Sequence, residues 1–319
     1  MSVPTLARRL LRRAAHAYAT GGGLASASRE GMALDEEFLR RLERLSLLAR
    51  RPAAGGIGGE HRSAARAPST DFADFRRYMP GDDFRRIDWN AYGRLGQLYV
   101  KLTEAREQLV VHVLLDASNS MDWGLPSKLV YGRQLAAAIA YLALARFDRV
   151  SITALGETAR QFSPVRGRAR FHDLLGFLNA TAAAGRMSLD GSLADYRTDS
   201  HRGQVMLISD MLAPEGYQDG LDRLLRAGLD VIVLNVLSPQ ELAPGLGGDV
   251  ELLDAETGEV VEVSLTSETT AQYRERLDRW CADVETFCAQ RGIRYRRVST
   301  ATPFEDLLLD SLRRGLILK

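Results

Sequence analysis

The 319-residue chain contains few cysteines and no long apolar run. Its two cysteines, Cys281 and Cys288, lie in a segment that we expect to be one helix, which separates them by about 10 Å along the axis. A disulfide needs Cα atoms within about 7 Å, so we expect two free thiols, which suit a reducing cytoplasm. The longest apolar run, residues 135–145, is too short to cross a bilayer. We therefore predict a cytoplasmic protein with no membrane span.

A large net charge is also missing. The 42 Lys and Arg residues nearly balance the 41 Asp and Glu residues, and the formal charge is +1. This excludes the chain-wide positive charge of many nucleic-acid-binding proteins, although a local basic patch stays possible. Hydrophobic residues at 45% and charged residues at 26% are typical of a folded globular protein.

The composition separates an N-terminal extension from the rest. Residues 1–31 carry five arginines and no acid before Glu30, and a run of three glycines at 21–23 interrupts any helix. A transit peptide has this composition. We interpret the segment as a disordered extension or a start codon assigned too early.

Two further parts follow. Residues 32–108 begin with an amphipathic helix at 34–50, pass through an aperiodic, glycine-containing linker and end in a compact block at 71–108, in which we expect a short strand at 98–102. Residues 109–319 form the main domain, and a hairpin with its turn at 256–258 is inserted at about 245–266.

Apolar runs and helical patterns alternate throughout the main domain. The expected strands are 109–115, 150–155, 205–208, 231–237 and 293–298. The expected helices are 128–146, 171–180, 218–227, 269–290 and 304–314. This alternation predicts an α/β fold with a doubly wound, mostly parallel sheet and helices on both faces.

Acids and hydroxyls follow the strands of this sheet. Asp116, Ser118 and Ser120 occupy alternate positions directly after the first strand, and Asp210 follows the third. A loop between them contains Ser188. Ligands of such sheets bind beyond the carboxyl ends of the strands, so we expect these side chains to meet there.

Two carboxylates and three hydroxyls are hard oxygen ligands, which suit Mg²⁺ or Mn²⁺. Waters would complete the shell, and a carboxylate from another protein could displace one of them. The sequence therefore predicts a metal-dependent binding site. A turn of the form Asp-x-Ser-x-Ser also describes a simple helix-capping turn, and that alternative stays open.

The segment 114–121 (LLDASNSM) resembles the metal-ion-dependent adhesion site of von Willebrand factor A domains. That family adds a Thr from a second loop and an Asp after a later strand. The matching positions are Ser188, which keeps the hydroxyl although it is not Thr, and Asp210. The block 78–89 (YMPGDDFRRIDW) resembles the signature of the bacterial domain-of-unknown-function family 58.

This resemblance covers roughly residues 34–319 and implies a von Willebrand factor A-like, Rossmann-like fold. It also implies a partner, an AAA+ ATPase of the MoxR type, because members are commonly encoded beside such ATPases. We therefore expect a binding module without catalytic activity. It would hold an acidic side chain of a partner protein and assist chaperone-like activation or complex assembly.

The block 78–89 allows two interpretations of its own. Its arginines and acids can form ion pairs that hold a turn, with Trp89 packed beneath. We favour this structural interpretation, and a partner-docking surface is the alternative.

Two other functions remain as alternatives. A metal-dependent hydrolase is one, but a phosphatase of the haloacid dehalogenase type needs a second Asp where Ser118 stands. A serine nucleophile needs a His within reach, and His112 is expected in the core. Nucleic-acid binding through the arginine-rich segments 8–13 and 291–297, the latter with Tyr295, is the other alternative.

Overall fold

A computed structural model describes residues 36–49, 72–80, 82–103, 110–146, 148–198, 203–213, 215–244, 248–253 and 260–314. The chain divides into two compact units. The large unit comprises Met1–Ala53 and Leu109–Lys319, and the small unit comprises Ala54–Gln108. The predicted extension at 1–31 and the glycine-rich part of the linker lie outside the described residues.

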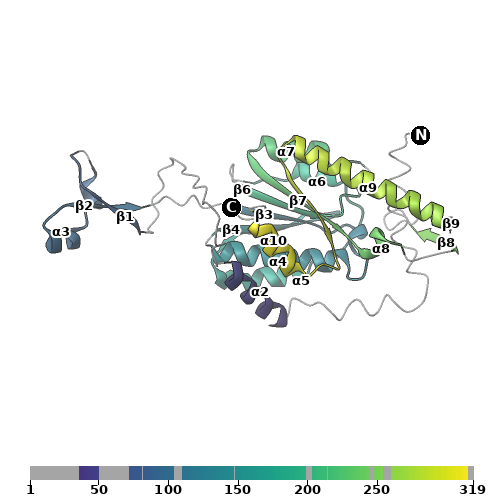
Figure 1. Cartoon of the computed structure of the whole chain (residues 1–319), viewed down its shortest axis with the longest axis horizontal. Helices are drawn as coiled ribbons and strands as arrows, with labels where there is room; N and C mark the ends of the chain where they lie inside the picture. Colours follow the sequence, from purple (N-terminus) through teal and green to yellow (C-terminus); the bar gives the residue numbers. More distant parts are fainter. Residues whose placement is uncertain are drawn as a thin grey trace. The chain divides into compact units, whose positions relative to one another are not determined.

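A six-stranded sheet forms the centre of the large unit (Figure 1). Its strands in spatial order are β10 (Arg294–Ser299), β7 (Leu229–Leu237), β6 (Gly203–Ser209), β3 (Val110–Asp116), β4 (Arg149–Leu155) and β5 (Arg160–Arg166). All neighbours are parallel except β4 and β5. The predicted doubly wound, mostly parallel sheet is therefore confirmed.

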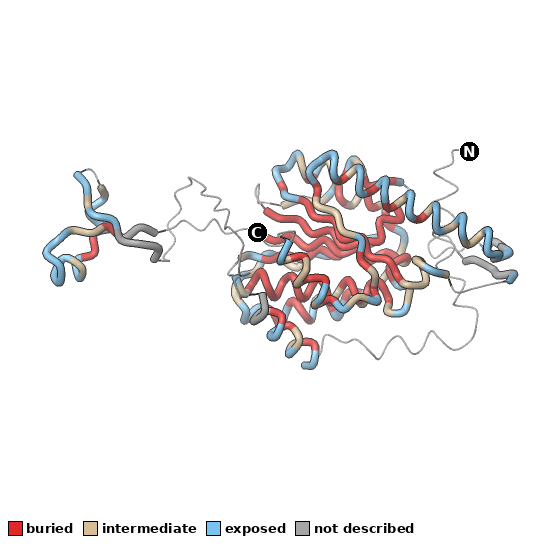
Figure 2. The backbone as a smooth tube through the Cα atoms, in the orientation of Figure 1, coloured by how far each residue is buried: buried red, intermediate tan, exposed pale blue. Residues whose placement is uncertain are grey.

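The central strands are buried along their whole length. Every residue of β3 and β6 is buried, as expected for parallel strands covered on both faces (Figure 2). The register pairs Leu115 of β3 with Ile208 of β6 and Asp116 with Leu155 of β4. The carboxyl ends of these strands consequently lie side by side, which is where the acids and hydroxyls were predicted to meet.

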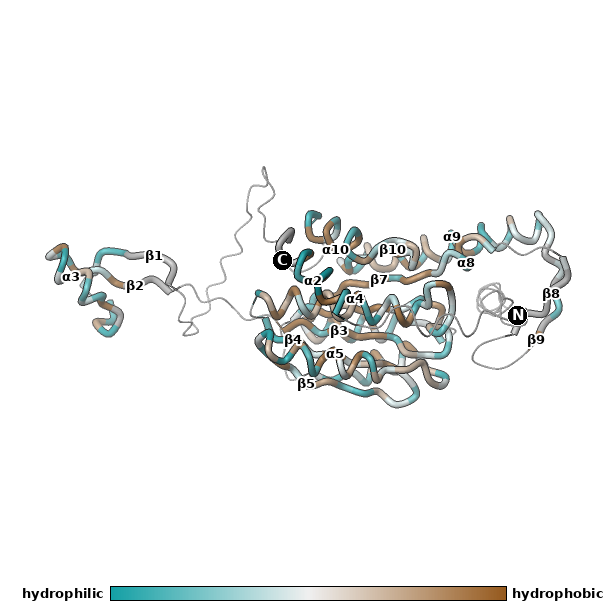
Figure 3. The backbone as a smooth tube through the Cα atoms, turned by 90° about the horizontal axis from the view of Figure 1, so that it is seen from below, coloured by the Kyte–Doolittle hydropathy of each residue, from teal (hydrophilic) through white to brown (hydrophobic). Residues whose placement is uncertain are grey.

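Helices cover both faces of this sheet (Figures 1 and 3). One face carries α2 (Glu36–Ala49), α4 (Lys128–Ala145), α5 (Phe171–Asn179) and α10 (Phe304–Arg313). The other face carries α6 (Leu189–Asp195), α7 (Gln218–Arg226) and α9 (Ser267–Gln290). Helix α4 is almost entirely buried, because it lies between the sheet and the outer helices α2, α5 and α10.

Helix α2 belongs to the large unit, which differs from the predicted grouping of residues 32–108. Its apolar face, formed by Phe38, Leu42 and Leu45, is buried in the same core as α4 and α10. The ring centroids of Phe38 and Phe304 lie 5.2 Å apart. The chain therefore crosses from the large unit to the small unit after this helix and returns before β3.

The predicted inserted hairpin is present as β8 (Gly248–Leu253) and β9 (Val260–Leu265), which pair antiparallel. The turn predicted at 256–258 lies outside the described residues. Helix α8 (Pro239–Leu242) is a single turn that starts where β7 ends.

The small unit is a hairpin of β1 (Phe72–Arg77) and β2 (Tyr99–Thr103) with η1 (Phe84–Arg86) and α3 (Trp89–Leu95) between the strands. The sequence predicted β2 but not β1. Among its described side chains, only Ile87 and Val100 are buried apolar groups.

Across the described parts of the chain, no helix has both the length and the apolarity that a membrane crossing requires.

Candidate functional site

The turn after β3 gathers three of the predicted site oxygens. The Asp116 Oδ1 atom accepts hydrogen bonds from the Ser118 backbone N–H at 2.9 Å and from Ser118 Oγ at 2.6 Å. Ser118 Oγ lies 3.0 Å from Ser120 Oγ. All three residues are buried. The one-turn helix η2 (Asn119–Met121) continues the chain from this point.

The turn after β6 lies against the first. Ser209 Oγ donates to Asp116 Oδ2 at 2.6 Å and thus links the ends of β3 and β6. Asp210 Oδ1 accepts the Leu212 N–H at 2.9 Å. Met211, between them, adopts a φ of 57°. A buried non-glycine residue in this left-handed region is strained, and such strain is typical of functional turns.

Lys128, at the start of α4, also reaches this edge. Its Nζ atom donates to Asp210 Oδ2 at 2.8 Å and to Glu241 Oε1 at 2.6 Å. The Lys128 side chain is 0% exposed. Burial alone would lower the pKa of Lys128, but the carboxylates of Asp210 and Glu241 raise it above its ordinary value. The ammonium therefore stays charged.

The buried charges at this edge do not balance. When ionised, the three carboxylates of Asp116, Asp210 and Glu241 and the single ammonium of Lys128 sum to −2, and all four groups are buried. Burial, and then the charge of Asp210, raise the pKa of Asp116. A further cation at this edge would relieve that repulsion.

Ser188 lies in the third predicted segment. Its hydroxyl caps helix α6 and accepts the Gly191 N–H at 3.1 Å. Backbone hydrogen bonds from Asn119 N to Gly185 O and from Ala184 N to Ala117 O hold this loop against the Asp116 turn. The loop thus meets the site, although no direct contact joins the Ser188 hydroxyl to the other four side chains.

This donor set partly fits a hard divalent cation. Asp116, Ser118 and Ser120 provide neighbouring oxygens, and the net negative charge favours a cation there. Asp210 shares one of its oxygens with Lys128, so its remaining lone pairs would have to serve the ion directly or through water. Among the described residues, no cluster of three or more His, Cys, Asp or Glu side chains is arranged to hold a metal. A metal here would depend on the serine hydroxyls.

Two residues at this edge escaped the sequence analysis: Lys128 and Glu241. Glu241 follows β7, where it forms a capping box with Ser238. Inspection of the residues after the fourth strand, as was done for the first and third, would have found Glu241. Lys128 is one of only three lysines in a chain whose other basic residues are arginines. That rarity was the only local signal for Lys128.

His112 does not serve the serines of the site. Its Nδ1 atom lies 2.9 Å from Ser151 Oγ and 2.9 Å from the Tyr196 hydroxyl. Its side chain is buried within β3, as the sequence predicted. No imidazole in the described parts of the chain hydrogen-bonds to Ser118 or Ser120.

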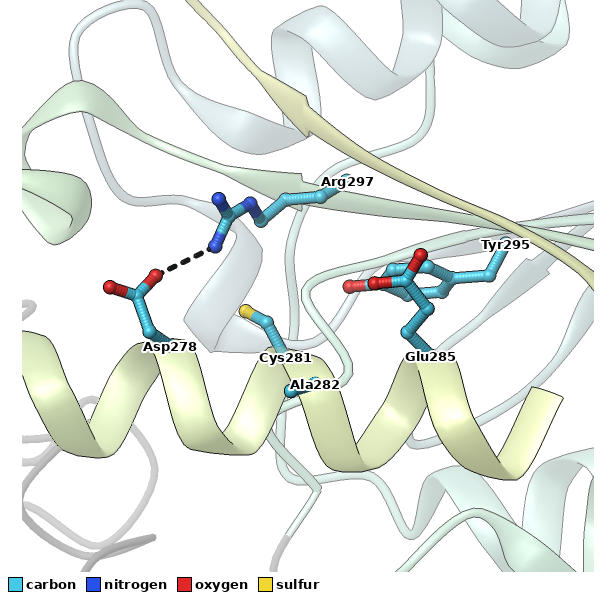
Figure 4. Close-up of a pocket in the computed structure, with 6 residues that line it drawn as sticks. All are labelled: Asp278, Cys281, Ala282, Glu285, Tyr295 and Arg297. Atoms are coloured by element: carbon cyan, nitrogen blue, oxygen red, sulfur yellow. Dashed lines mark hydrogen bonds and ion pairs between the residues drawn. The ribbon is translucent and has the colours of Figure 1, made fainter. Parts of the chain in front are cut away.

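A separate cavity of about 270 Å³ lies between α9 and the edge strand β10 (Figure 4). Arg297 spans it and donates to Asp278 at 2.9 Å. Cys281 lies between them on α9, and burial raises the pKa of its thiol. A thiol of this kind is a poor nucleophile. Both cysteines are free and buried.

The arginines of β10 are neutralised locally. Arg294 pairs with Asp230, Arg296 with Asp310 at 2.6 Å and Arg297 with Asp278. Tyr295 accepts a hydrogen bond from the Asn235 amide at 2.9 Å. This segment is a strand of the sheet and not a free basic surface for nucleic acid. The segment 8–13 lies outside the described residues.

A mostly parallel sheet with an acidic, hydroxyl-rich cluster at its carboxyl edge defines a doubly wound α/β domain. Residues 74–284 match the family described as "Protein of unknown function DUF58". Two uncharacterized proteins, from Mycobacterium tuberculosis and Mycobacterium bovis, are each 30% identical over 239 residues, which cover 72% of this chain and 75% of each relative. The chain belongs to the DUF58 family, as the block 78–89 predicted.

Similar solved structures are more distant. The conserved hypothetical protein BatB from Bacteroides thetaiotaomicron aligns with 65% of this chain and 98% of its own length, at 16% identity and a TM-score of 0.39. The SpRpn10 VWA domain aligns with 66% of this chain and 99% of its own length, at 8% identity and a TM-score of 0.35. The fold assignment rests on the strand order and not on these likenesses.

Proposed function

We propose that this protein is a divalent-metal-dependent protein-binding module that partners an AAA+ ATPase of the MoxR type. The ion would be Mg²⁺ or Mn²⁺, held by Asp116, Ser118 and Ser120, with Asp210 and Ser188 completing the set directly or through water. The module would assist chaperone-like activation or assembly of other proteins.

The observation that carries this proposal is the buried charge imbalance at the carboxyl edge of the sheet. Two of the three buried carboxylates, Asp210 and Glu241, share the ammonium of Lys128, and the serine hydroxyls lie beside the third, Asp116, which has no cationic partner among the described residues. Burying unpaired charge is costly, so a cation that restores balance would bind favourably. A divalent ion supplies the two positive charges that the set lacks.

An ion held on one side only by protein oxygens keeps positions for exchangeable ligands. A carboxylate from a partner would complete its shell and bind through the metal. This gives the module a preference for an acidic side chain. The ATPase partner is suggested by membership of the DUF58 family together with the resemblance described above.

Thermal unfolding of the full chain in Mg²⁺, Mn²⁺ or EDTA tests the metal site. A ligand at about 100 times its Kd stabilises the folded state by about 2.7 kcal/mol, which corresponds to a rise of roughly 5–10 °C in Tm for a unit of this size. Asp116→Ala should abolish the rise. Asp122→Ala is the matched control, because Asp122 lies in the same loop but is exposed. An identical Tm for the unaltered chain in all three solutions would refute the metal site.

The partner is tested separately by pull-down with a purified MoxR-type ATPase from the same genome, with and without ATP and Mg²⁺. We expect capture that needs Mg²⁺, survives in Asp122→Ala and is lost in Asp116→Ala. Capture that persists in EDTA would contradict a metal-mediated contact. If metal raises the Tm of the chain but the chain captures no ATPase, the metal site is supported and the proposed ATPase partner is wrong.

A further inference from the structure

The small unit displays most of the large apolar side chains that the described residues leave exposed. Seven such side chains are exposed, and five of them lie between residues 79 and 95. They are Met79 at 63%, Phe84 at 66%, Trp89 at 62%, Tyr92 at 46% and Leu95 at 64% exposure. We call these five side chains the α3 surface. One of the two sequence interpretations required Trp89 to pack beneath the turn. The structure contradicts it, because Trp89 is exposed.

Helix α3 presents three of these side chains in a fixed arrangement. Trp89, Tyr92 and Leu95 recur every three residues and so share one side of the helix. The rings of Trp89 and Tyr92 meet edge to face with their centroids 6.2 Å apart. Asp88 caps the start of the helix, and Gly96, at a φ of 65°, ends it. A short capped helix thus fixes the positions of these three side chains relative to one another.

The described part of the small unit buries few apolar side chains. Its described buried apolar side chains are Ile87 and Val100, which lie on the bridge between the η1 segment and β2. Among the side chains whose burial is described in this unit, more large apolar groups are exposed than buried. Exposed apolar patches that combine Trp, Tyr and Arg mark protein–protein contacts.

The acids of the turn are occupied by local contacts. Asp82 pairs with Arg76 at 2.8 Å, and this hydrogen bond lowers the pKa of Asp82. Asp83 accepts the Arg85 N–H at 3.0 Å. Asp88 accepts two N–H groups at the start of α3. Each of these carboxylates therefore accepts a backbone N–H or forms an ion pair within the small unit.

The arginines beside the α3 surface are not similarly neutralised. Arg85 and Arg94 are exposed, and no carboxylate of the described residues pairs with either. The Arg85 guanidinium lies 5.9 Å from the centre of the Phe84 ring. Positive charge thus borders the apolar side chains, and a complementary partner would carry carboxylates at the edge of an apolar stripe.

We propose that the α3 surface docks an acidic amphipathic segment of a partner protein. Apolar side chains of that segment cover Trp89, Tyr92 and Leu95, and its carboxylates pair with Arg85 and Arg94. An anionic membrane is the other occupant that these charges would attract, and the vesicle experiment below distinguishes it from a protein segment. This contact needs no metal and is independent of the function proposed above.

The test is a selection of random 16-residue peptides on the full chain, followed by fluorescence anisotropy with the enriched peptides. We expect peptides that combine Asp or Glu with apolar residues at helical spacing. Trp89→Ala and Leu95→Ala should each weaken their binding by at least about tenfold. The double exchange Arg85→Glu and Arg94→Glu should turn the preference toward basic peptides.

Leu125→Ala is the matched control, because Leu125 is also exposed but lies in the large unit. It should leave peptide binding unchanged, as should Asp116→Ala and EDTA. Circular dichroism of each variant establishes that it is folded. If the Trp89→Ala variant is unfolded, Leu95→Ala and the charge exchange still decide the result.

Three outcomes would overturn the proposal. If the enriched peptides contain no excess of Asp and Glu, the proposed pairing of partner carboxylates with Arg85 and Arg94 is excluded. Sedimentation of the chain with phosphatidylglycerol vesicles that is lost in Trp89→Ala, without selective peptide binding, would assign the surface to a membrane. Acrylamide quenching that is the same in the unaltered chain and in Trp89→Phe would show that Trp89 is already covered in the free chain.

Discussion

The carboxyl edge of the large unit and the α3 surface of the small unit differ in what they bury. The large unit buries charge, with Lys128 at 0% exposure between two carboxylates. The small unit exposes apolar side chains, and most of its described charged side chains are exposed or half-buried. The first arrangement favours an ion, and the second favours an apolar partner. The two proposed contacts therefore depend on different physical forces, the first on charge and the second on apolar burial.

The substitution Lys128→Met should have the largest effect among the tests of this contrast. Removal of the ammonium leaves the buried carboxylates of Asp210 and Glu241 without their shared partner, so the free energy of unfolding should fall by about 3–5 kcal/mol. Urea unfolding followed by circular dichroism measures it. The second change Glu241→Gln should restore part of the loss. A loss below about 1 kcal/mol would mean that the charges are not truly buried.

A matched pair of leucines tests the two units directly. Leu42 is buried at 0% exposure, and Leu95 is exposed at 64%. Leu42→Ala should cost about 3 kcal/mol, because it opens a cavity beneath α2. Leu95→Ala should change stability by less than about 0.5 kcal/mol. Equal losses in urea unfolding would indicate that Leu95 is buried in solution.

The third prediction concerns pH. Burial, and then the charge of Arg149, lower the pKa of His112 from 6.5 to about 4. The unfolded chain therefore binds the proton first, and the stability from neutral His112 is complete above pH 6.5 and is lost as pH falls toward 4. Between about pH 7 and pH 5 the large unit should lose about 2 kcal/mol through this group.

Urea unfolding of the unaltered chain and of His112→Gln at several pH values measures this effect. The free energy of unfolding of the His112→Gln variant should change less with pH than that of the unaltered chain, whatever its absolute value. The fluorescence difference between the unaltered chain and Trp89→Phe isolates Trp89 from Trp123 and Trp280, and this signal from the small unit should not show the same pH dependence. Parallel pH curves for the two proteins would contradict the assignment to His112.

Much of the fold could be predicted because burial on both faces leaves a clear mark in the sequence. The continuous apolar runs of β3, β6 and β7 and the alanine-rich pattern of α4 identified their elements directly. Strands β1 and β5 were missed. Strand β5 is an edge strand with Pro164 and mostly exposed residues, so it has no apolar run. Edge strands depend on a neighbour more than on their own composition.

Only part of the candidate site could be predicted from the sequence, namely the turn that carries Asp116, Ser118 and Ser120. Asp116, Ser118 and Ser120 are close in sequence, and the strand before them fixes where they lie. Lys128 and Glu241 come from other elements, and nothing near them in the sequence shows that they would meet Asp210. Their partnership exists only because α4 starts, and β7 ends, at the same edge of the sheet.

The sequence by itself determined the alternation of strands and helices, the turn that carries Asp116 and the family to which the chain belongs. These depend on patterns within a few residues, where apolar periodicity and turn chemistry act. Only the tertiary structure decided that a buried lysine neutralises Asp210 and that Trp89 faces outward. Burial and charge pairing are properties of packing, and packing joins residues that the sequence keeps far apart.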